Sequence, residues 1–325
     1  MAALSKMLTM SLLYPFVKKH LSTYFSFRSD GAPTAPTYFP WDFKGLSYEP
    51  FSFYSRGWKI NGYRYSYGNE KPKGLIVFHH GLGAGHFSYT ALIYDLAKMG
   101  YVVYAYDNIG CSLSEGEYVE NMAVAALTQK DFYAYLETDP KADGLKRISV
   151  GHSWGGWVAL CALAGEYKVD KVISFAGFTS MLNILTSRAP KDAPHGKGIV
   201  GDMRHYLKST YGDLALFDAL EELKTTNKDV LYIQGDKDEM VSFERNGKAI
   251  KESCKDNKHV RVMVRKGMNH DPFWTMEGEK YYLSIAKGKN GFTSRERKKN
   301  VEYDRRLLTE NDEVVLKAIN DFLAE

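Results

Sequence analysis

The sequence is poor in cysteine: its 325 residues include only Cys111, Cys161 and Cys254, with no CxxC pair. An odd number of widely spaced cysteines argues against a disulfide framework, so we expect three reduced thiols and a cytoplasmic location. The chain also lacks an HExxH motif, a Cys/His cluster and a P-loop. We therefore predict no metal and no nucleotide or other cofactor.

Long hydrophobic runs and a strong excess of one charge are absent as well. No stretch of about 20 apolar residues occurs, so the sequence holds no strong candidate for a transmembrane helix. The formal net charge is only +4, and no basic block has the pattern of a recognition helix, so we expect no nucleic-acid partner. The composition is otherwise that of an ordinary globular protein, and no pattern in it specifies an oligomeric state.

Residues 1–45 are predicted to form an N-terminal extension and linker. The first 27 residues are rich in apolar side chains, but Pro15 and two lysines interrupt them too early for the apolar centre of a signal peptide. We expect a helix packed on the domain; peripheral contact with a membrane through residues 1–27 is the alternative and is not favoured. Residues 28–45 contain three prolines and are typical of an extended linker.

Short apolar strands alternate with helices over most of the remaining chain. Strand patterns occur at residues 74–79, 101–106, 147–150, 172–175, 230–233 and 259–264, and helical patterns at 89–99, 122–137, 154–164, 244–253 and 311–324. Such alternation indicates βαβ units, and residues 46–68, with expected turns at Gly57 and at Asn61-Gly62, predict an antiparallel hairpin. The predicted fold is therefore α/β: a mostly parallel central sheet with an N-terminal antiparallel hairpin, helices on both faces and a helical cap insertion.

Two long segments interrupt this alternation. Residues 177–227 carry helix-like apolar runs and are predicted to form a cap or lid, because long excursions in compact domains are usually functional. Residues 272–311 form a second, charged excursion, for which we expect a solvated helical face; contact with anionic lipid or a partner is the alternative. The predicted core comprises residues 46–176 and 228–325.

The strongest chemical signal is the run GHSWG at residues 151–155, which lies between a predicted strand and a predicted helix. This is the context in which the G-x-S-x-G pattern marks a nucleophile. In so tight a turn neighbouring Cβ atoms would clash, so glycines flank a serine whose hydroxyl is exposed. The helix N-terminus that follows favours developing negative charge. Ser153 is therefore the candidate nucleophile, with a structural serine as the alternative.

From about Leu46 to the C-terminus, apart from the two excursions, the chain resembles the α/β-hydrolase fold family. It is most similar to the branch that holds serine esterases, monoacylglycerol-lipase-like hydrolases and S33-type serine aminopeptidase-like proteins. The resemblance is carried by His80-Gly81, by the D-x-x-G-x-x-x-S-E-G turn at residues 107–116, and by the serine turn. Asn108 departs from the family, which often has arginine there.

A serine nucleophile needs a base, and imidazole is the usual one because its pKa lies near working pH. Family order along the chain is serine, acid, histidine. The resemblance thus implies His270, just after the last predicted strand, as the base. The family pattern G-x-x-D-x-x-V implies Asp238 as the acid that orients the imidazole. Asp236 is the rival candidate, and its alternative role is to form a turn.

Acyl transfer also needs an oxyanion hole. Its first donor should be the backbone N–H of Trp154, the residue after the nucleophile. The resemblance implies the N–H of Leu82 as the second donor, with Gly83 as the alternative. Three aromatic residues are candidates for lining an acyl pocket: Phe87, Phe178 and Trp274.

We therefore predict a serine hydrolase that cleaves small-molecule carboxylic esters through a Ser-His-Asp triad and an acyl-enzyme intermediate. Two alternatives stay open: a serine aminopeptidase-like peptidase or amidase, and a non-catalytic binding protein on a hydrolase fold. An aminopeptidase needs carboxylates that bind a substrate amine, and the predicted cap offers few candidates for this role: Asp192, Asp202 and Asp213.

Overall fold

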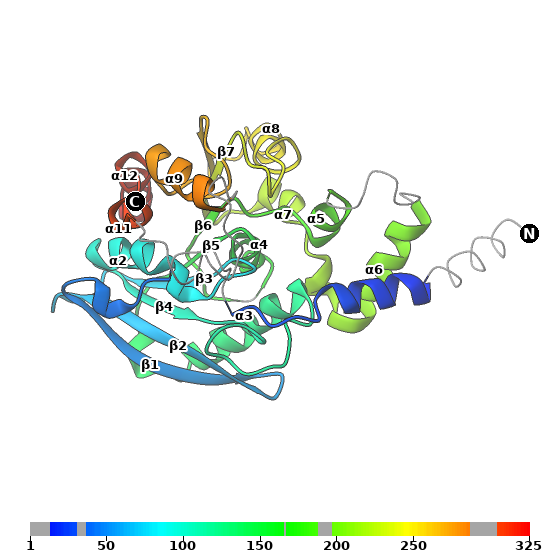
Figure 1. Cartoon of the computed structure of the whole chain (residues 1–325), viewed down its shortest axis with the longest axis horizontal. Coiled ribbons are helices and arrows are strands. Elements are labelled where there is room, and N and C mark those ends of the chain that lie inside the picture. Colours follow the sequence, from blue (N-terminus) through cyan, green and yellow to red (C-terminus); the bar gives the residue numbers. More distant parts are fainter. Residues whose placement is uncertain (1–13, 31–36, 166, 188–196, 287–303) are drawn as a thin grey trace, which may run out of the picture.

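The computed structural model describes residues 14–30, 37–165, 167–187, 197–286 and 304–325 (Figure 1). Its centre is an eight-stranded sheet in the order β1-β2-β4-β3-β5-β6-β7-β8. The strands are β1 (Leu46–Ser55), β2 (Trp58–Tyr67), β3 (Leu75–His79), β4 (Val102–Tyr106), β5 (Arg147–His152), β6 (Lys171–Phe175), β7 (Asp229–Gly235) and β8 (Val260–Arg265). β2 pairs antiparallel with both β1 and β4, and all other pairs are parallel. The predicted α/β-hydrolase fold, a mostly parallel sheet with an antiparallel hairpin, is confirmed.

Helices cover both faces of the sheet. They are α2 (Thr90–Lys98), α3 (Met122–Leu136), α4 (Trp154–Cys161), α5 (Met181–Ser187), α6 (Lys197–Tyr211), α7 (Ala219–Thr225), α8 (Ala249–Ser253), α9 (Met276–Ala286), α11 (Arg305–Thr309) and α12 (Glu313–Ala324). A π-helical turn, Glu244–Lys248, leads into α8. The described residues also contain short 3-10 helices at Pro40–Asp42, His86–Tyr89, Pro140–Ala142 and Asp213–Leu216.

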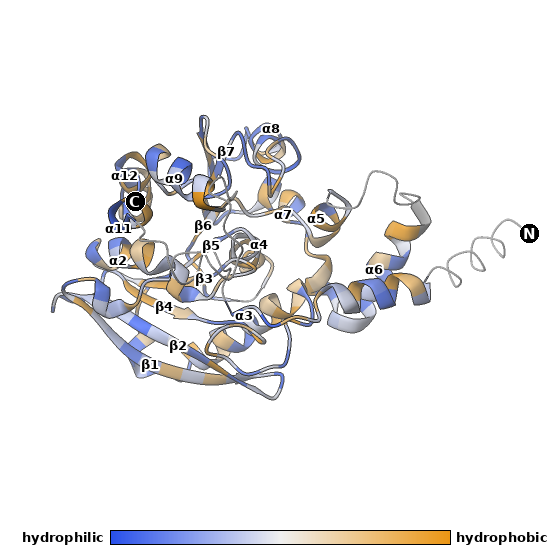
Figure 2. Cartoon of the chain, in the orientation of Figure 1, coloured by the Kyte–Doolittle hydropathy of each residue, from blue (hydrophilic) through white to orange (hydrophobic). Residues whose placement is uncertain are grey.

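The core consists of two apolar clusters, one on each face of the sheet. In β3, Leu75 and Val77 join the cluster of α3, α4, α6 and α7, whereas Ile76 and Phe78 join the cluster of α2 and α12. A strand sends alternate side chains to opposite faces, so one buried on both faces becomes a continuous apolar run. Apolar colour accordingly fills β4, while the edge hairpin β1–β2 is mixed (Figure 2). This explains why the central strands were predictable.

One predicted turn is wrong. The hairpin turns at Arg56 and Gly57, which both have positive φ, as expected. The second expected turn, at Asn61-Gly62, does not exist, because β2 runs straight through it and Gly62 pairs with both Phe51 and Tyr106. A Cβ at Gly62 would overlap the carbonyl oxygen of Ala105. The glycine therefore allows close approach of β4 and not a change of direction.

The N-terminal region packs on the domain wherever the structure describes it. Residues 14–24 are helical. Val17, Leu21 and Phe25 are buried in the first apolar cluster, as expected for a packed helix. The prediction for residues 1–13 lies outside the described residues.

The two predicted excursions contain helices. Residues 177–227 lie between β6 and β7 and hold α5, α6 and α7, with residues 188–196 outside the description. Residues 272–311 hold α9 and α11. Most of the charged stretch before residue 304 lies outside the described residues. Within the described ranges no helix is long and apolar enough to cross a bilayer. All three cysteines are buried and free, as predicted.

Candidate active site

Ser153 sits at the junction of β5 and α4 in a strained conformation. Its φ and ψ are 57° and −117°, a region that L-residues rarely adopt. A Cβ at Gly151 would overlap the carbonyl of Gly155, and one at Gly155 would overlap the carbonyl of His79. The Ser153 N–H donates to the Phe175 carbonyl at 2.8 Å, which ties the turn to β6. The local structure is thus the tight strand-to-helix turn that the glycine pattern predicted.

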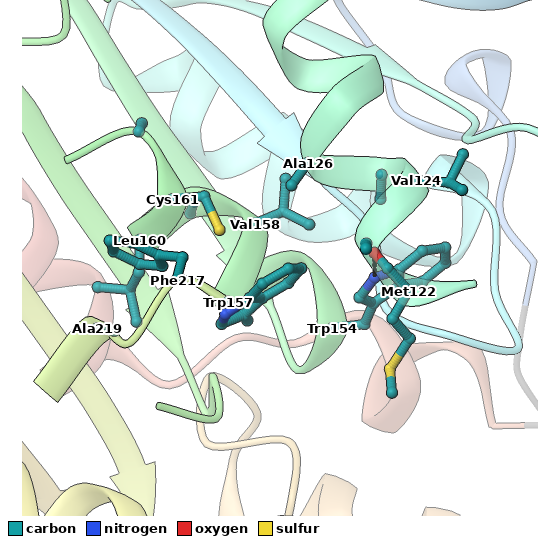
Figure 3. Close-up of a cluster of buried hydrophobic side chains, with 14 of the residues drawn as sticks. Met122, Val124, Ala126, Trp154, Trp157, Val158, Leu160, Cys161, Phe217 and Ala219 are labelled. Atoms are coloured by element: carbon teal, nitrogen blue, oxygen red, sulfur yellow. Dashed lines mark hydrogen bonds between the residues drawn. The ribbon is translucent and has the colours of Figure 1, made fainter. Parts of the chain in front are cut away.

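The first turn of α4 is anchored by a buried indole. The Nε1–H of Trp154 donates to the carbonyl of Met122, at the start of α3, at 2.9 Å (Figure 3). Trp157, one turn later, stacks on Phe178 with ring centroids 5.5 Å apart. These contacts fix the position of α4, and with it the backbone that carries Ser153.

Asp238 and His270 meet at the carboxyl ends of β7 and β8. His270 Nδ1 lies 3.0 Å from each carboxylate oxygen of Asp238, which is the pairing predicted from sequence. Asp238 also accepts the N–H groups of Met240 and Val241, both at 2.8 Å, and the amide of Gln234 at 3.0 Å. A carboxylate held by this many donors is fixed in orientation and can fix the imidazole in turn.

The same donors set the charge state of Asp238. Burial by itself would raise the pKa of this carboxyl, but the hydrogen bond and charge of His270, with the donors from Val241 and Gln234, hold the pKa below its usual value. Asp238 is therefore charged at neutral pH. The rival, Asp236, accepts the N–H of Gly267 at 2.7 Å. That bond holds the loop at residues 266–267, which is the turn-forming role considered for it.

Hydrogen bonds from α9 hold the loop that carries His270. Both carboxylate oxygens of Glu279 accept the N–H of Asn269, at 2.8 and 2.9 Å, and one of them accepts the N–H of Asp271 at 3.4 Å. The Asn269 side chain accepts the N–H of Glu239 at 2.9 Å, which joins this loop to the loop of Asp238. Sequence reasoning missed Glu279, because the segment that contains it was interpreted only as a charged excursion.

A chain of hydrogen bonds brings His270 next to the serine turn. The Gly81 N–H donates to the hydroxyl of Tyr89 at 3.1 Å, and that hydroxyl lies 2.9 Å from Nδ1 of His152. His152 Nε2 lies 2.8 Å from the His270 carbonyl, and the two imidazole centroids are 4.7 Å apart. Since His152 directly precedes Ser153, the loop of His270 is packed against the serine turn.

The backbone groups expected to form the oxyanion hole are distinguished by their partners. The Gly83 N–H, the alternative donor, is already donated to the hydroxyl of Ser29 at 3.0 Å. No partner for the N–H of Leu82 or of Trp154 occurs among the residues that the structure describes. A Cβ at Gly81 would lie 3.5 Å from Cβ of Ser153, so the two turns are adjacent.

The three aromatic candidates for substrate contact lie in different places. Phe87 is half-buried and packs on Tyr63 of β2, Phe178 is buried against α4, and Trp274 is buried against Tyr282 of α9. A pocket of about 660 Å³ lies beside the loop of Asp238 and includes none of them. Its lining residues are Tyr24, Ser187, Asp236–Met240 and Ser242–Glu244. A role for the three aromatics in binding an acyl chain stays a prediction.

Comparison of the sequence with known families and proteins gives partial matches. Residues 70–195 match the family described as "Serine aminopeptidase, S33". A proline iminopeptidase of Clostridium botulinum is 33% identical over 129 residues, which is 39% of this chain and 41% of that protein. A proline iminopeptidase of Lactobacillus delbrueckii subsp. bulgaricus is 33% identical over 101 residues, or 31% and 33% of the two chains. The match thus spans about two fifths or less of these relatives.

Solved structures match over much more of the chain. The Pyrococcus furiosus esterase Pf2001 superposes with a TM-score of 0.61 at 16% identity, covering 91% of this chain and 98% of that one. Est1E of Butyrivibrio proteoclasticus, solved with ferulic acid bound, gives 0.56 at 17% identity, covering 84% and 98%. The Pyrococcus horikoshii acylaminoacyl peptidase gives 0.55 at 18% identity, covering 82% of this chain and 44% of that one. At these identities the likeness establishes a shared fold.

Proposed function

We propose that this chain, which has the α/β-hydrolase fold, is a serine hydrolase that cleaves carboxylic esters. The observation that carries the proposal is the strained Ser153 turn packed against the loop in which His270 is paired with Asp238. In this reaction the Ser153 hydroxyl attacks the ester carbonyl, and His270 takes its proton. Asp238 keeps the imidazole oriented and stabilises its protonated form.

The proposed oxyanion hole consists of the N–H groups of Leu82 and Trp154, which converge on the carbonyl oxygen as it becomes negative. Both are free to donate in the described part of the chain. His270 then protonates the leaving alcohol, and water, activated by the same imidazole, hydrolyses the acyl-enzyme. Residues 177–227 are proposed to cover the site as a cap that selects the acyl and alcohol groups.

A serine aminopeptidase-like activity is the second candidate, and the match of residues 70–195 to the S33 family favours it. An aminopeptidase would need carboxylates that bind the substrate's α-amine. Asp192 lies outside the described residues, Asp202 is buried, and Asp213 pairs with Lys208 at 2.8 Å. Neither Asp202 nor Asp213, the two candidates that the structure describes, therefore presents an exposed and unpaired carboxylate to an amine, and we place ester hydrolysis first.

A substrate panel separates the two candidates. We expect p-nitrophenyl esters from acetate to palmitate to be hydrolysed and aminoacyl anilides to be left intact, with all activity lost in Ser153→Ala. Preference for short chains would indicate a carboxylesterase, and preference for long chains a lipid substrate. Turnover of the anilides alone would replace the ester proposal by the peptidase. Equal ester turnover by Ser153→Ala would contradict both.

A further inference from the structure

We propose that the N-terminal strap, residues 14–30, holds the oxyanion turn in its working conformation, with the Ser29 hydroxyl as the positioning residue. The oxyanion turn is residues 80–83, which carry the proposed Leu82 donor. This inference rests on the proposed function, because it assigns the strap a part in the same site. It gives a role to a segment that the sequence presents only as an extension and linker.

Ser29 is built into the domain. It forms an isolated β-bridge with Cys111, in which its N–H donates to the Gly110 carbonyl at 2.8 Å and its carbonyl accepts the Ser112 N–H at 3.1 Å. Its side chain is 3% exposed and accepts the Gly83 N–H at 3.0 Å. The backbone of Ser29 is thus held by the loop after β4, and its hydroxyl contacts the oxyanion turn.

The bond to Ser29 decides which amide of the turn can face a substrate. Gly83 has a φ of 80°, a conformation that glycine adopts readily, and its N–H donates to the hydroxyl of Ser29. Without this acceptor the Gly83 amide would be partly buried and unpaired, and its peptide unit would turn to find another partner. Because that peptide adjoins Leu82, such a rotation would move the Leu82 N–H away from the oxyanion.

Arg28 fixes the backbone that presents Ser29. Its guanidinium donates to the carbonyls of Gly116 and Ser112, both at 2.6 Å, and of Ser114 at 2.8 Å. A planar guanidinium that holds three carbonyls at once leaves the backbone little freedom. The Val119 N–H also donates to the carbonyl of Phe27 at 3.0 Å. Each of residues 27, 28 and 29 of the strap is therefore hydrogen-bonded to the loop after β4.

The other end of the strap contacts the proposed cap. Its helix, residues 14–24, lies beside α6 in Figure 1. Tyr14 and His205 of α6 make an edge-to-face contact with centroids 5.2 Å apart. Val17 and Leu21 belong to the same apolar cluster as Leu207 of α6. One continuous segment thus links the cap to the oxyanion turn.

The test is a set of serine variants of the full chain, assayed on p-nitrophenyl esters and with a fluorophosphonate. We expect Ser29→Ala to lower kcat and the phosphonylation rate by about tenfold with KM changed less than about twofold, since only the oxyanion donor is displaced. Ser29→Thr keeps the hydroxyl and should restore most of kcat. Ser26→Ala is the matched control, because that hydroxyl donates to the carbonyls of Ser22 and Thr23, at the end of the strap's own helix.

Three outcomes are distinguishable. A fall in kcat for Ser29→Ala, with rescue by threonine, supports the proposal. A Ser29→Ala enzyme with the kcat of Ser26→Ala, even if less stable to heat, would show that Ser29 serves stability alone and would overturn it. Activity that survives in Ser153→Ala would instead remove the proposed function, whatever the Ser29 variants do.

Discussion

Tyr89 and His152 join three parts of the candidate site, and the direction of each hydrogen bond follows from its partner. The His270 carbonyl can only accept, so Nε2 of His152 carries the proton. Burial, with the nearby charge of His270, lowers the pKa of His152 to about 3, so the ring is neutral and its Nδ1 is an acceptor. The Tyr89 hydroxyl must then donate to Nδ1 and accept from the Gly81 N–H.

This directionality predicts that Tyr89→Phe impairs catalysis more than stability. Loss of the hydroxyl leaves the Gly81 N–H and the His152 ring unpaired beside the reacting groups, so we expect kcat to fall by about tenfold, equivalent to ~1.4 kcal/mol. Tyr101→Phe is the matched control. Tyr101 has the same exposed fraction as Tyr89, and its hydroxyl donates to the Leu323 carbonyl at 3.2 Å, far along the chain from the site residues.

Both variants should lose similar stability, about 1 kcal/mol, as each breaks one buried hydrogen bond. The measurement is kcat on a p-nitrophenyl ester beside the free energy of unfolding in urea. Equal kcat for the two variants would mean that the chain through Tyr89 only supports the fold.

The candidate nucleophile and its partners were predictable because they stand in short motifs, whereas their supports were not. Ser153, Asp238 and His270 each lie in a local pattern at a strand end. Tyr89 and Glu279 reach the site from helices, and nothing in their own neighbourhoods marks them. Such contacts depend on how distant elements pack and not on local spacing.

The antiparallel strand β2 joins the hairpin to the parallel sheet, and its register depends on Gly62. Asn-Gly is a strong turn signal, which is why a turn was expected there. The signal fails because backbone approach overrides local preference: the Gly62 position faces the β4 backbone so closely that no side chain fits. The remainder of the sheet was predictable because continuous apolar runs indicate strands that are buried on both faces.

Gly62→Ala should therefore strongly destabilise the fold. The added methyl group would overlap the Ala105 carbonyl oxygen, and backbone cannot move aside as a flexible side chain can, so we expect a loss of about 3 kcal/mol. Ser66→Ala, in the same strand, is the control and should change stability by less than about 0.5 kcal/mol. Urea unfolding measures both. A Gly62→Ala protein as stable as the control would show that β2 is not packed on β4 as described.

Several buried or half-buried ionisable groups make the stability of the whole molecule depend on pH, and the half-buried Asp271 gives the clearest case. Burial raises the pKa of its carboxyl to about 6, with Asp238 acting in the same direction and His270 against it. The folded chain therefore binds this proton more readily than the unfolded chain, whose aspartates titrate near 3.9. The contribution of Asp271 to stability is fully present in acid and is lost as pH rises through about 6.

Asp271→Asn removes this dependence. We expect the variant to gain stability relative to wild type as pH rises from 4.5 to 8, by ~1–2 kcal/mol after allowance for the partial exposure of the side chain. Asp143→Asn, at an exposed carboxylate, should show no such trend. Urea unfolding at several pH values measures the difference. A gap between wild type and Asp271→Asn that stays constant with pH would contradict the assignment.

The most direct measurement is the rate and site of labelling by a fluorophosphonate, which reacts with a serine only where a base and an oxyanion hole activate it. We expect wild type to be labelled at Ser153, Ser153→Ala not at all, and Asp238→Asn at least about a hundredfold more slowly. Asp236→Asn, altered two residues away, should react like wild type. Labelling of Ser153→Ala, or equal rates for the two aspartate variants, would contradict the proposed Ser153-His270-Asp238 site.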